Sequence, residues 1–219
     1  MDSALKKKKK IRSLYVVGNS YSSTTPESAH AMWPGELSRL LGFPFIQARN
    51  AAQPSAGLFT TTFPLARRGL VDQLKSLPAG PKKNALLVIW IFPPKVGNGI
   101  LPIEEATYTL GIDLAYAQGF RIVLMPNLPD PSGLPYAVEL YTPEQLAIIR
   151  ANWVQFNADY AAMIKRFKKR HPEMAFGSVD IFNLWDGSGT VDGLHPGAET
   201  HKLFAQWFEA RARKLARRR

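Results

Sequence analysis

Short apolar runs alternate along the chain with longer stretches in which apolar positions recur at helical spacing. The runs at 14–17, 85–92 and 121–125 predict buried strands, and 44–48 and 175–181 fit two more. The run at 85–92, A-L-L-V-I-W-I-F, is apolar throughout, as is typical of a central parallel strand covered on both faces. The pattern therefore predicts five strands.

The stretches between these runs predict five helices, over 33–41, 65–77, 103–118, 143–170 and 196–215. The best-marked start is at Thr142, which can cap a helix whose first turn holds Pro143 and whose capping box is completed by Gln145. Strands that alternate with helices predict a three-layer α/β/α domain with a five-stranded parallel sheet. Catalytic groups are then expected at the carboxyl ends of the strands, beneath the Pro- and Gly-rich segment 126–141.

Composition narrows the chemistry. The 219 residues, 46% of them hydrophobic, suffice for one sizeable core. The absence of Cys excludes disulfides, thiolate metal sites and a Cys nucleophile, and it fits a reducing compartment. Four scattered His show no zinc signature, so no metal or cofactor is expected.

The net charge of +11 is concentrated at the two ends of the chain. The basic residues of 1–12 and 209–219 account for nearly all of it, and the folded body expected over 13–208 is close to neutral. We expect residues 1–12 to be a disordered basic tail and 209–219 to be the basic end of the last helix. Either end could contact an anionic membrane surface, but no specific nucleic acid and no obligate protein partner is indicated.

The apolar run after the N-terminal lysines, 11–17, is too short for a signal peptide. No stretch of about eighteen apolar residues is present to span a membrane. The sequence therefore favours a cytoplasmic location, although a secreted mature form stays open.

G-N-S-Y-S follows directly on the first strand and places Ser20 at the carboxyl edge of the sheet. A serine nucleophile needs a neighbouring base, because its hydroxyl is hardly ionised at neutral pH. It also needs N–H donors for the oxyanion that forms on attack. Gly, Asn and Ser are equally typical of an ordinary turn or helix cap, so this motif alone does not decide.

D-G-L-H-P lies just before the last helix. An Asp three residues before a His can accept the imidazole N–H, so that Asp192 would orient His195 and leave its other ring nitrogen free to face Ser20. The alternative is a plain turn with a surface His. His30, His171 and His201 have no comparable setting and are interpreted as structural.

Together the two motifs resemble those of the SGNH (GDSL-type) hydrolases, a serine esterase and lipase family with a flavodoxin-like fold. W-P-G-E-L-S-R-L-L-G (33–42), L-V-D-Q-L (70–74) and N-L-P-D-P-S-G-L-P-Y-A (127–137) are also similar to family segments, and the resemblance covers 13–208 in order. It implies that Ser20 is the nucleophile and first oxyanion donor, His195 the general base, and Asp192 the residue that orients it.

The sequence departs from the family at the other oxyanion donors. Asn19 replaces the usual Asp before the serine, which keeps the size and hydrogen bonding of that side chain but not its charge. The family's backbone donor after the second strand is assigned to Gly57, with Ser55 as the alternative. The family's Asn after the third strand is replaced by Pro93 and Pro94; Asn98 could take its place or be a turn residue.

The sequence thus predicts a hydrolase that cleaves acetyl or acyl esters, including lipid esters, through an acyl-enzyme on Ser20. Leu58, Phe59, Phe63, Leu134 and Tyr136 are the apolar residues expected near the acyl chain. The alternative is a catalytically weak SGNH-like domain that binds anionic membrane or nucleic acid through its basic ends. Carbohydrate acetates, phospholipids, simple esters and thioesters all fit this kind of site, because a fold does not choose among substrates.

Overall fold

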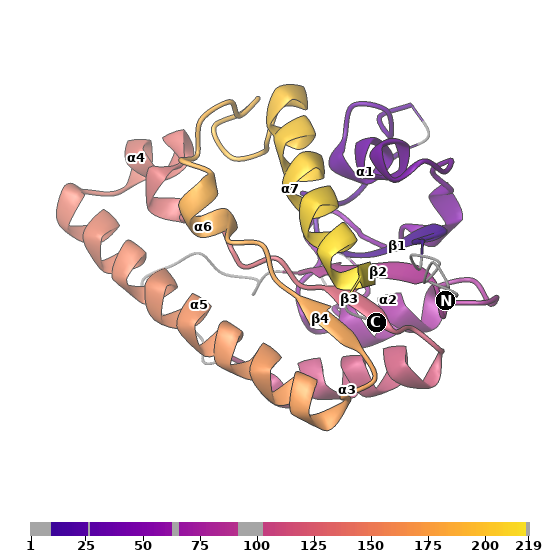
Figure 1. Ribbon diagram of the computed structural model, residues 1–219. Helices are drawn as coiled ribbons and strands as arrows, with labels where there is room; N and C mark the ends of the chain where they lie inside the picture. Colours follow the sequence, from indigo (N-terminus) through magenta and orange to yellow (C-terminus); the bar gives the residue numbers. More distant parts are fainter. Residues whose placement is uncertain (1–9, 26, 63–65, 92–102, 218–219) are drawn as a thin grey trace, which may run out of the picture.

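The computed structural model describes residues 10–25, 27–62, 66–91 and 103–217. Its centre is a parallel sheet in which the strands follow one another in chain order (Figure 1). The strands are β1 (Ser13–Gly18), β2 (Ala85–Trp90), β3 (Ile122–Leu124) and β4 (Ala175–Gly177). Strands β1 and β2 are buried at every position, which explains their nearly unbroken apolar sequence. The α/β fold with a parallel sheet is confirmed.

The sheet has four strands rather than five, because the strand predicted over 44–48 does not form. Pro44 has no N–H to donate, Ile46 is 40% exposed, and the chain continues as the short 3₁₀ helix η1 (Gln47–Arg49). The edge position beside β1 is instead taken by the residues that follow. Ala51 N–H donates to Val16 O (2.9 Å) and Gln53 N–H to Gly18 O (3.2 Å).

Helices cover both faces of the sheet (Figure 1). On one face α1 (Trp33–Leu41) packs against α7 (Ala198–Arg217). The opposite face is covered by α2 (Leu70–Ser76), α3 (Glu105–Ala117) and α5 (Pro143–Arg170). Three further short elements are η2 (Pro131–Gly133), α4 (Pro135–Leu140) and α6 (Ile181–Leu184), and η2 contacts both α4 and α5.

Of two helix starts predicted from the local sequence, one forms as predicted and the other is shifted. The capping box is present: Thr142 Oγ1 accepts the Gln145 N–H (3.3 Å), and Gln145 Oε1 accepts the Thr142 N–H (2.9 Å). The helix predicted from 65 begins only at Leu70, because Arg67 pairs with Thr61 in a pair of backbone hydrogen bonds (2.9 and 3.0 Å). A tertiary contact has replaced the first helical turn.

The basic C-terminal end of the chain is part of the folded body as far as residue 217. Ala212 and Leu215 on α7 are buried, and the Arg213 guanidinium donates to the Leu40 carbonyl of α1 (2.9 Å). The lysine run at 6–9 lies outside the described residues.

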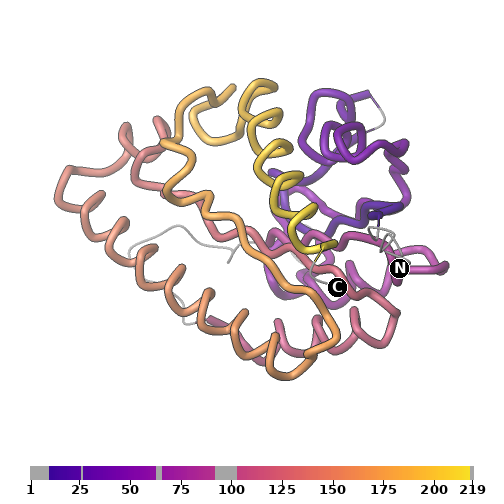
Figure 2. The backbone as a smooth tube through the Cα atoms, in the orientation of Figure 1, coloured from indigo at the N-terminus to yellow at the C-terminus, as the bar shows by residue number. Residues whose placement is uncertain are grey.

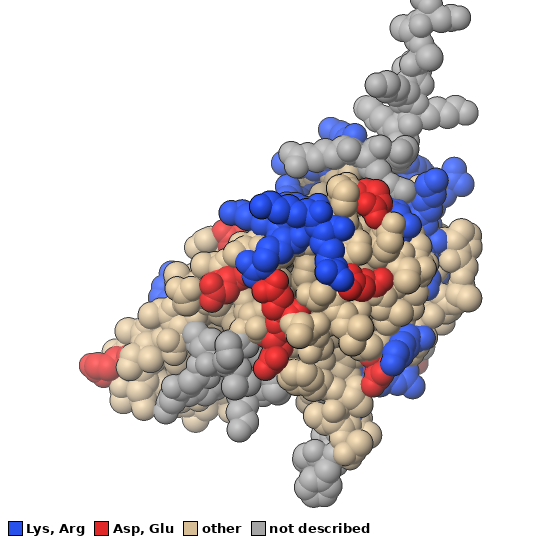
Figure 3. Space-filling view, turned by 90° about the horizontal axis from the view of Figure 1, so that it is seen from below, with Lys and Arg blue, Asp and Glu red and all other residues tan. Residues whose placement is uncertain are grey.

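Basic and acidic side chains lie beside one another on the face seen from below (Figure 3). Two ion pairs link α5 to α3: Arg166 to Glu105 (2.5 Å) and Arg170 to Asp113 (2.6 Å). Among the described residues, no helix combines the length and apolarity needed to cross a bilayer.

Candidate active site

Ser20 lies two residues beyond the end of β1, at the carboxyl edge of the sheet. The strand ends at Gly18, where a Cβ atom would lie 2.5 Å from the Trp90 carbonyl oxygen and 2.9 Å from Ser22 Oγ. Only glycine therefore lets the chain turn this close to β2. Gly18 is also fixed by Gln73 of α2, whose fully buried amide accepts its N–H (2.7 Å) and donates to its carbonyl (2.9 Å).

Asn19 closes the turn that carries the serine. Its carbonyl accepts the N–H groups of Ser22 and Ser23 (both 3.0 Å), and its side-chain Oδ1 accepts the N–H of Tyr21 (3.2 Å). The amide oxygen thus accepts the hydrogen bond that a carboxylate would accept in this turn, which explains how Asn can stand where the family that the sequence resembles has Asp.

The second motif forms a tight loop ahead of α7. Asp192 Oδ1 accepts the backbone N–H groups of Leu194 (3.0 Å) and His195 (2.6 Å). Gly193 has φ 79°, and a Cβ there would approach Tyr136 N to 3.1 Å. The loop's shape thus depends on Gly193 in the left-handed region and on the Asp192 side chain.

The structure brings Ser20, His195 and Asp192 together. His195 Nδ1 lies 2.7 Å from Asp192 Oδ2, and His195 Nε2 lies 3.1 Å from Ser20 Oγ. With the proton on Nδ1, the imidazole donates to the carboxylate and accepts from the serine hydroxyl. The three groups therefore have the order and the hydrogen-bond reach that a nucleophile, its base and the group that orients the base require.

The electrostatics of this cluster favour an ionised carboxylate. The backbone N–H of His195, followed by its side chain, lowers the pKa of Asp192 to about 2. Two peptide donors and the imidazole stabilise the negative charge even though the Asp192 side chain is 52% exposed. Asp192 can thus stabilise an imidazolium formed at His195.

A cavity of about 420 Å³ opens beside Ser20 and His195. Its wall is largely apolar and is formed by Asn19, Ser20, Tyr21, Pro54, Ser55, Ala56, Leu128, Pro129, Pro131, Leu134, Trp153, Leu194 and His195. Apart from His195 and the phenol of Tyr21, none of the side chains in this lining is ionisable. The cavity is thus suited to an uncharged, apolar group.

Of the apolar residues expected beside an acyl chain, Leu134 lines the cavity. Leu58 is buried in the core, while Phe59 and Tyr136 are half exposed and Phe63 lies outside the described residues. Sequence reasoning missed Leu128 and Trp153. Leu128 lies in the Pro- and Gly-rich segment already expected over the site, whereas Trp153, on α5, had no local signal.

The candidate oxyanion donors differ in whether they lie beside the cavity. Ser55, not Gly57, lines the cavity, while Gly57 is buried. The reason is an early turn: Ala56 N–H donates to Gln53 O (3.2 Å), with Pro54 and Ser55 at its corner. Within the described part of the chain, no hydrogen bond occupies the N–H of Ser20 or Ser55. Asn98, Pro93 and Pro94 lie outside the described residues.

The segment 126–141 lies beside the loop 191–195 (Figure 2). Tyr136 N–H donates to Gly193 O (3.1 Å), and a Cβ on Gly133 would lie 2.9 Å from Asp186 O. The two segments therefore meet backbone to backbone, so 126–141 lies against the loop that carries His195 and Asp192.

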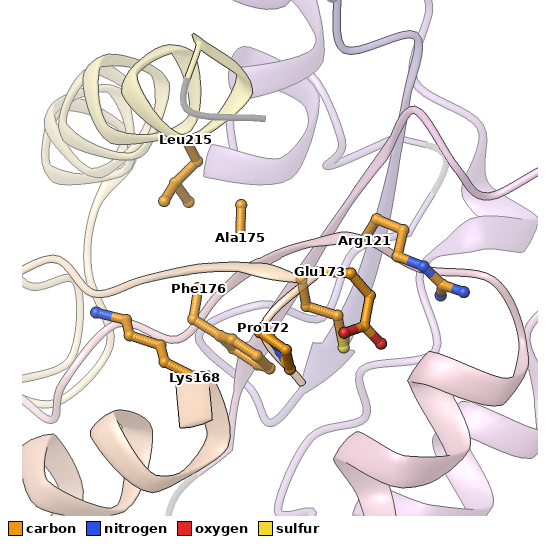
Figure 4. Close-up of a pocket in the computed structure, with 8 residues that line it drawn as sticks. Arg121, Lys168, Pro172, Glu173, Ala175, Phe176 and Leu215 are labelled. Carbon is orange, nitrogen blue, oxygen red and sulfur yellow. The ribbon is translucent and has the colours of Figure 1, made fainter. Parts of the chain in front are cut away.

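The cavity beside Ser20 is not the largest. A cavity of about 550 Å³ lies at the opposite edge of the sheet, where β4 begins, and is lined in part by Arg121, Lys168 and Glu173 (Figure 4). It contains no paired nucleophile and base among its lining residues. In the described ranges, no three His, Asp or Glu side chains converge as a metal site would require.

Comparison with protein-family models and with curated sequences finds no match for this chain. Two solved structures are similar to it over most of its length. A member of the lipolytic protein G-D-S-L family from Veillonella parvula DSM 2008 superposes with a TM-score of 0.57 at 10% identity, covering 89% of this chain and 94% of that one. The chain has the fold of a GDSL-type lipolytic protein.

The second structure, a candidate acylhydrolase from Bacteroides fragilis NCTC 9343, superposes with a TM-score of 0.53 at 16% identity, covering 97% of this chain and 90% of that one. Identities this low establish the architecture and nothing finer. They agree with the SGNH-like fold that the two sequence motifs indicated.

Proposed function

We propose that the protein is a serine hydrolase that cleaves carboxylic esters through an acyl-enzyme on Ser20. The observation that carries the proposal is the hydrogen-bonded series Ser20 Oγ, His195 Nε2, His195 Nδ1 and Asp192 Oδ2, with distances of 3.1 Å and 2.7 Å. The GDSL-type fold supports it, because the two similar structures are those of a lipolytic G-D-S-L family protein and a candidate acylhydrolase.

In the first half of the reaction, His195 Nε2 takes the proton of Ser20 as Oγ attacks the ester carbonyl carbon. The carbonyl oxygen becomes an oxyanion, for which the backbone N–H groups of Ser20 and Ser55 are the donors we propose. The tetrahedral intermediate collapses with loss of the alkoxide, which takes the proton from His195. The alcohol leaves, and the acyl group stays on Ser20.

In the second half, a water molecule gives a proton to His195 Nε2 and attacks the acyl carbon. Collapse of the second oxyanion breaks the bond to Ser20 Oγ, which recovers its proton from His195 as the carboxylic acid departs. Asp192 holds Nδ1–H throughout and stabilises the imidazolium without taking its proton.

The apolar wall of the cavity supports an uncharged apolar acyl group as the part of the ester bound beside Ser20. Leu128, Leu134 and Trp153 are the larger side chains that would contact it. The cavity lining therefore supports a preference for the acyl part of the ester. It does not distinguish among the alcohols that the ester could contain.

The proposal is tested by hydrolysis of p-nitrophenyl esters by the wild type and Ser20→Ala. Ser23→Ala is the matched control, because Ser23 lies in the same turn but not on the cavity wall. We expect Ser20→Ala to abolish hydrolysis and Ser23→Ala to retain it. Equal rates for Ser20→Ala and the wild type would overturn the proposal.

A further inference from the structure

Tyr21 connects the serine turn to the loop that carries the base. It directly follows Ser20, and its side chain is only 5% exposed. Its phenol hydroxyl donates to the carbonyl oxygen of Leu194 at 2.7 Å. Leu194 is the residue before His195, so this bond joins the neighbour of the nucleophile to the neighbour of the base across 173 positions of sequence.

Tyr21 is itself held firmly. The indole N–H of Trp33 donates to the Tyr21 carbonyl (2.9 Å). The phenol ring packs edge-on against Trp90, with ring centroids 5.8 Å apart, and against Trp185 at 6.2 Å. A fourth ring, that of His195, lies 5.9 Å away in the same edge-on arrangement. Because Tyr21 is held in the core by these contacts, its hydroxyl can hold the loop that carries His195 in a fixed position relative to the core.

The hydrogen bonds within the loop 191–195 determine the conformation of that loop, but they do not determine its position relative to Ser20. Asp192 accepts from Leu194 and His195, and the Val191 N–H donates to the His195 carbonyl (2.9 Å), all inside residues 191–195. Placement against Ser20 needs bonds to the rest of the molecule. Among the described residues, two such bonds join the backbone of the loop to other segments. The Tyr21 hydroxyl donates to the loop from the turn that carries Ser20, and the Tyr136 N–H of α4 donates to the Gly193 carbonyl.

Small errors in placement have large kinetic effects. A displacement of about 1 Å between reacting groups can lower the rate by ~100-fold. With Ser20 Oγ and His195 Nε2 already 3.1 Å apart, little lengthening is tolerable before proton transfer suffers.

We infer that Tyr21 is a positioning residue: its hydroxyl, bonded to the Leu194 carbonyl, sets the distance between His195 and Ser20. The inference rests on the proposed serine-hydrolase function. Tyr21 does not touch the reacting atoms in this account, and it acts through His195. Burial, and then the negative charge of Asp192, raises the pKa of its phenol, so the hydroxyl stays a donor at neutral pH.

The test is a double-mutant cycle with Tyr21→Phe, which keeps the packed ring and removes the donor. In the wild-type background we expect kcat to fall about tenfold, with KM nearly unchanged, because the ground-state cavity is intact. In a His195→Ala background we expect Tyr21→Phe to cause no further loss of the residual rate, since a residue that acts through His195 has nothing left to position.

Tyr160→Phe is the matched control. It also removes a buried phenol hydroxyl, but on α5, where its ring packs against Tyr108 (5.7 Å). We expect kcat to stay at the wild-type value in this variant. Urea unfolding of the three proteins separates lost stability from lost kcat.

The outcomes separate this inference from the proposed function. If Ser20→Ala abolishes hydrolysis but Tyr21→Phe retains wild-type kcat, the role of Tyr21 is overturned and the proposed function stands. The same follows if Tyr21→Phe lowers the rate by an equal factor with and without His195, because that is a general structural effect. Full activity in Ser20→Ala would overturn both.

Discussion

The side-chain amide of Gln73 makes two hydrogen bonds to one residue, Gly18, accepting its N–H at 2.7 Å and donating to its carbonyl at 2.9 Å. The bonds join α2 to the end of β1, two residues before the candidate nucleophile. The amide also donates to the Arg68 carbonyl (2.9 Å) and is fully buried. The Gln73 amide therefore gives Gly18 the pair of hydrogen bonds that the backbone of a neighbouring strand would otherwise provide.

Replacing Gln73 with Leu keeps the volume and removes every one of these bonds. The variant should lose about 3 kcal/mol of unfolding free energy, because the buried peptide groups of Gly18 lose a partner. Urea unfolding measures the loss. Gln155→Leu is the control, since Gln155 is exposed and bonds only to Asp159 (3.1 Å) among the described contacts. A Gln73→Leu protein as stable as this control would contradict the account.

Ser55 has φ 59° and is the only described non-glycine residue with positive φ. Such a conformation strains an L-residue by about 1 kcal/mol or more. Because its proposed role belongs to the backbone N–H, Ser55→Gly should stabilise the protein by about 1 kcal/mol relative to Ser55→Ala and leave kcat unchanged.

Thermal unfolding and ester hydrolysis of Ser55→Gly and Ser55→Ala check both halves of this expectation. A large fall in kcat in both variants would show that the Ser55 hydroxyl, and not its peptide N–H, takes part.

Trp153 lines the cavity beside Ser20 from α5 and is nearly buried. Trp153→Ala should move the preferred p-nitrophenyl ester towards longer acyl chains, because the lost indole leaves apolar space that a longer chain can fill. The truncation also costs about 3 to 5 kcal/mol of stability.

The measurement is kcat/KM across a series from acetate to dodecanoate. Val154→Ala provides the comparison, since Val154 neighbours Trp153 on α5 but is 51% exposed. An unchanged chain-length profile in Trp153→Ala would place the acyl group elsewhere.

His201 on α7 is 4% exposed, and burial, aided by the charge of His195, lowers its pKa to about 4. Between about pH 6.5 and pH 4 the unfolded chain therefore binds a proton at this residue that the folded protein does not. Stability rises with pH wherever the unfolded state binds more protons, so this contribution is complete above about pH 6.5 and is lost on acidification towards pH 4.

His201→Leu should accordingly flatten the fall in Tm over this window, and the same change at exposed His30 is the surface control. Thermal unfolding at several pH values distinguishes the two. Parallel pH dependence in His201→Leu and the wild type would rule out this source of acid sensitivity.

Sequence reasoning succeeded where local chemistry decides the structure. The run at 85–92 became the fully buried β2, and the Thr142–Gln145 pair formed its capping box. The short motifs around Ser20 and His195 could be combined because both adjoin a strand or helix end, where a parallel sheet gathers side chains.

It failed where a distant contact decides the structure. The mainly apolar run at 44–48 was predicted to be a strand from its pattern alone, but it is largely exposed and forms no strand. Residues 50–53 occupy the position beside β1 instead. Trp153 on α5 and Gln73 on α2 reach the site only through tertiary packing, which the local sequence pattern does not predict. The turn closed by Ala56 N–H and Gln53 O, which places Ser55 rather than Gly57 on the cavity wall, was not predicted either.

Whether Ser20 is a nucleophile activated by His195 can be measured by covalent labelling with a fluorophosphonate, followed by intact-protein and peptide mass spectrometry. We expect one adduct, on Ser20, in the wild type and in Ser23→Ala, none in Ser20→Ala, and strongly slowed labelling in His195→Ala. An adduct on another residue, or labelling at an equal rate in His195→Ala, would contradict this expectation.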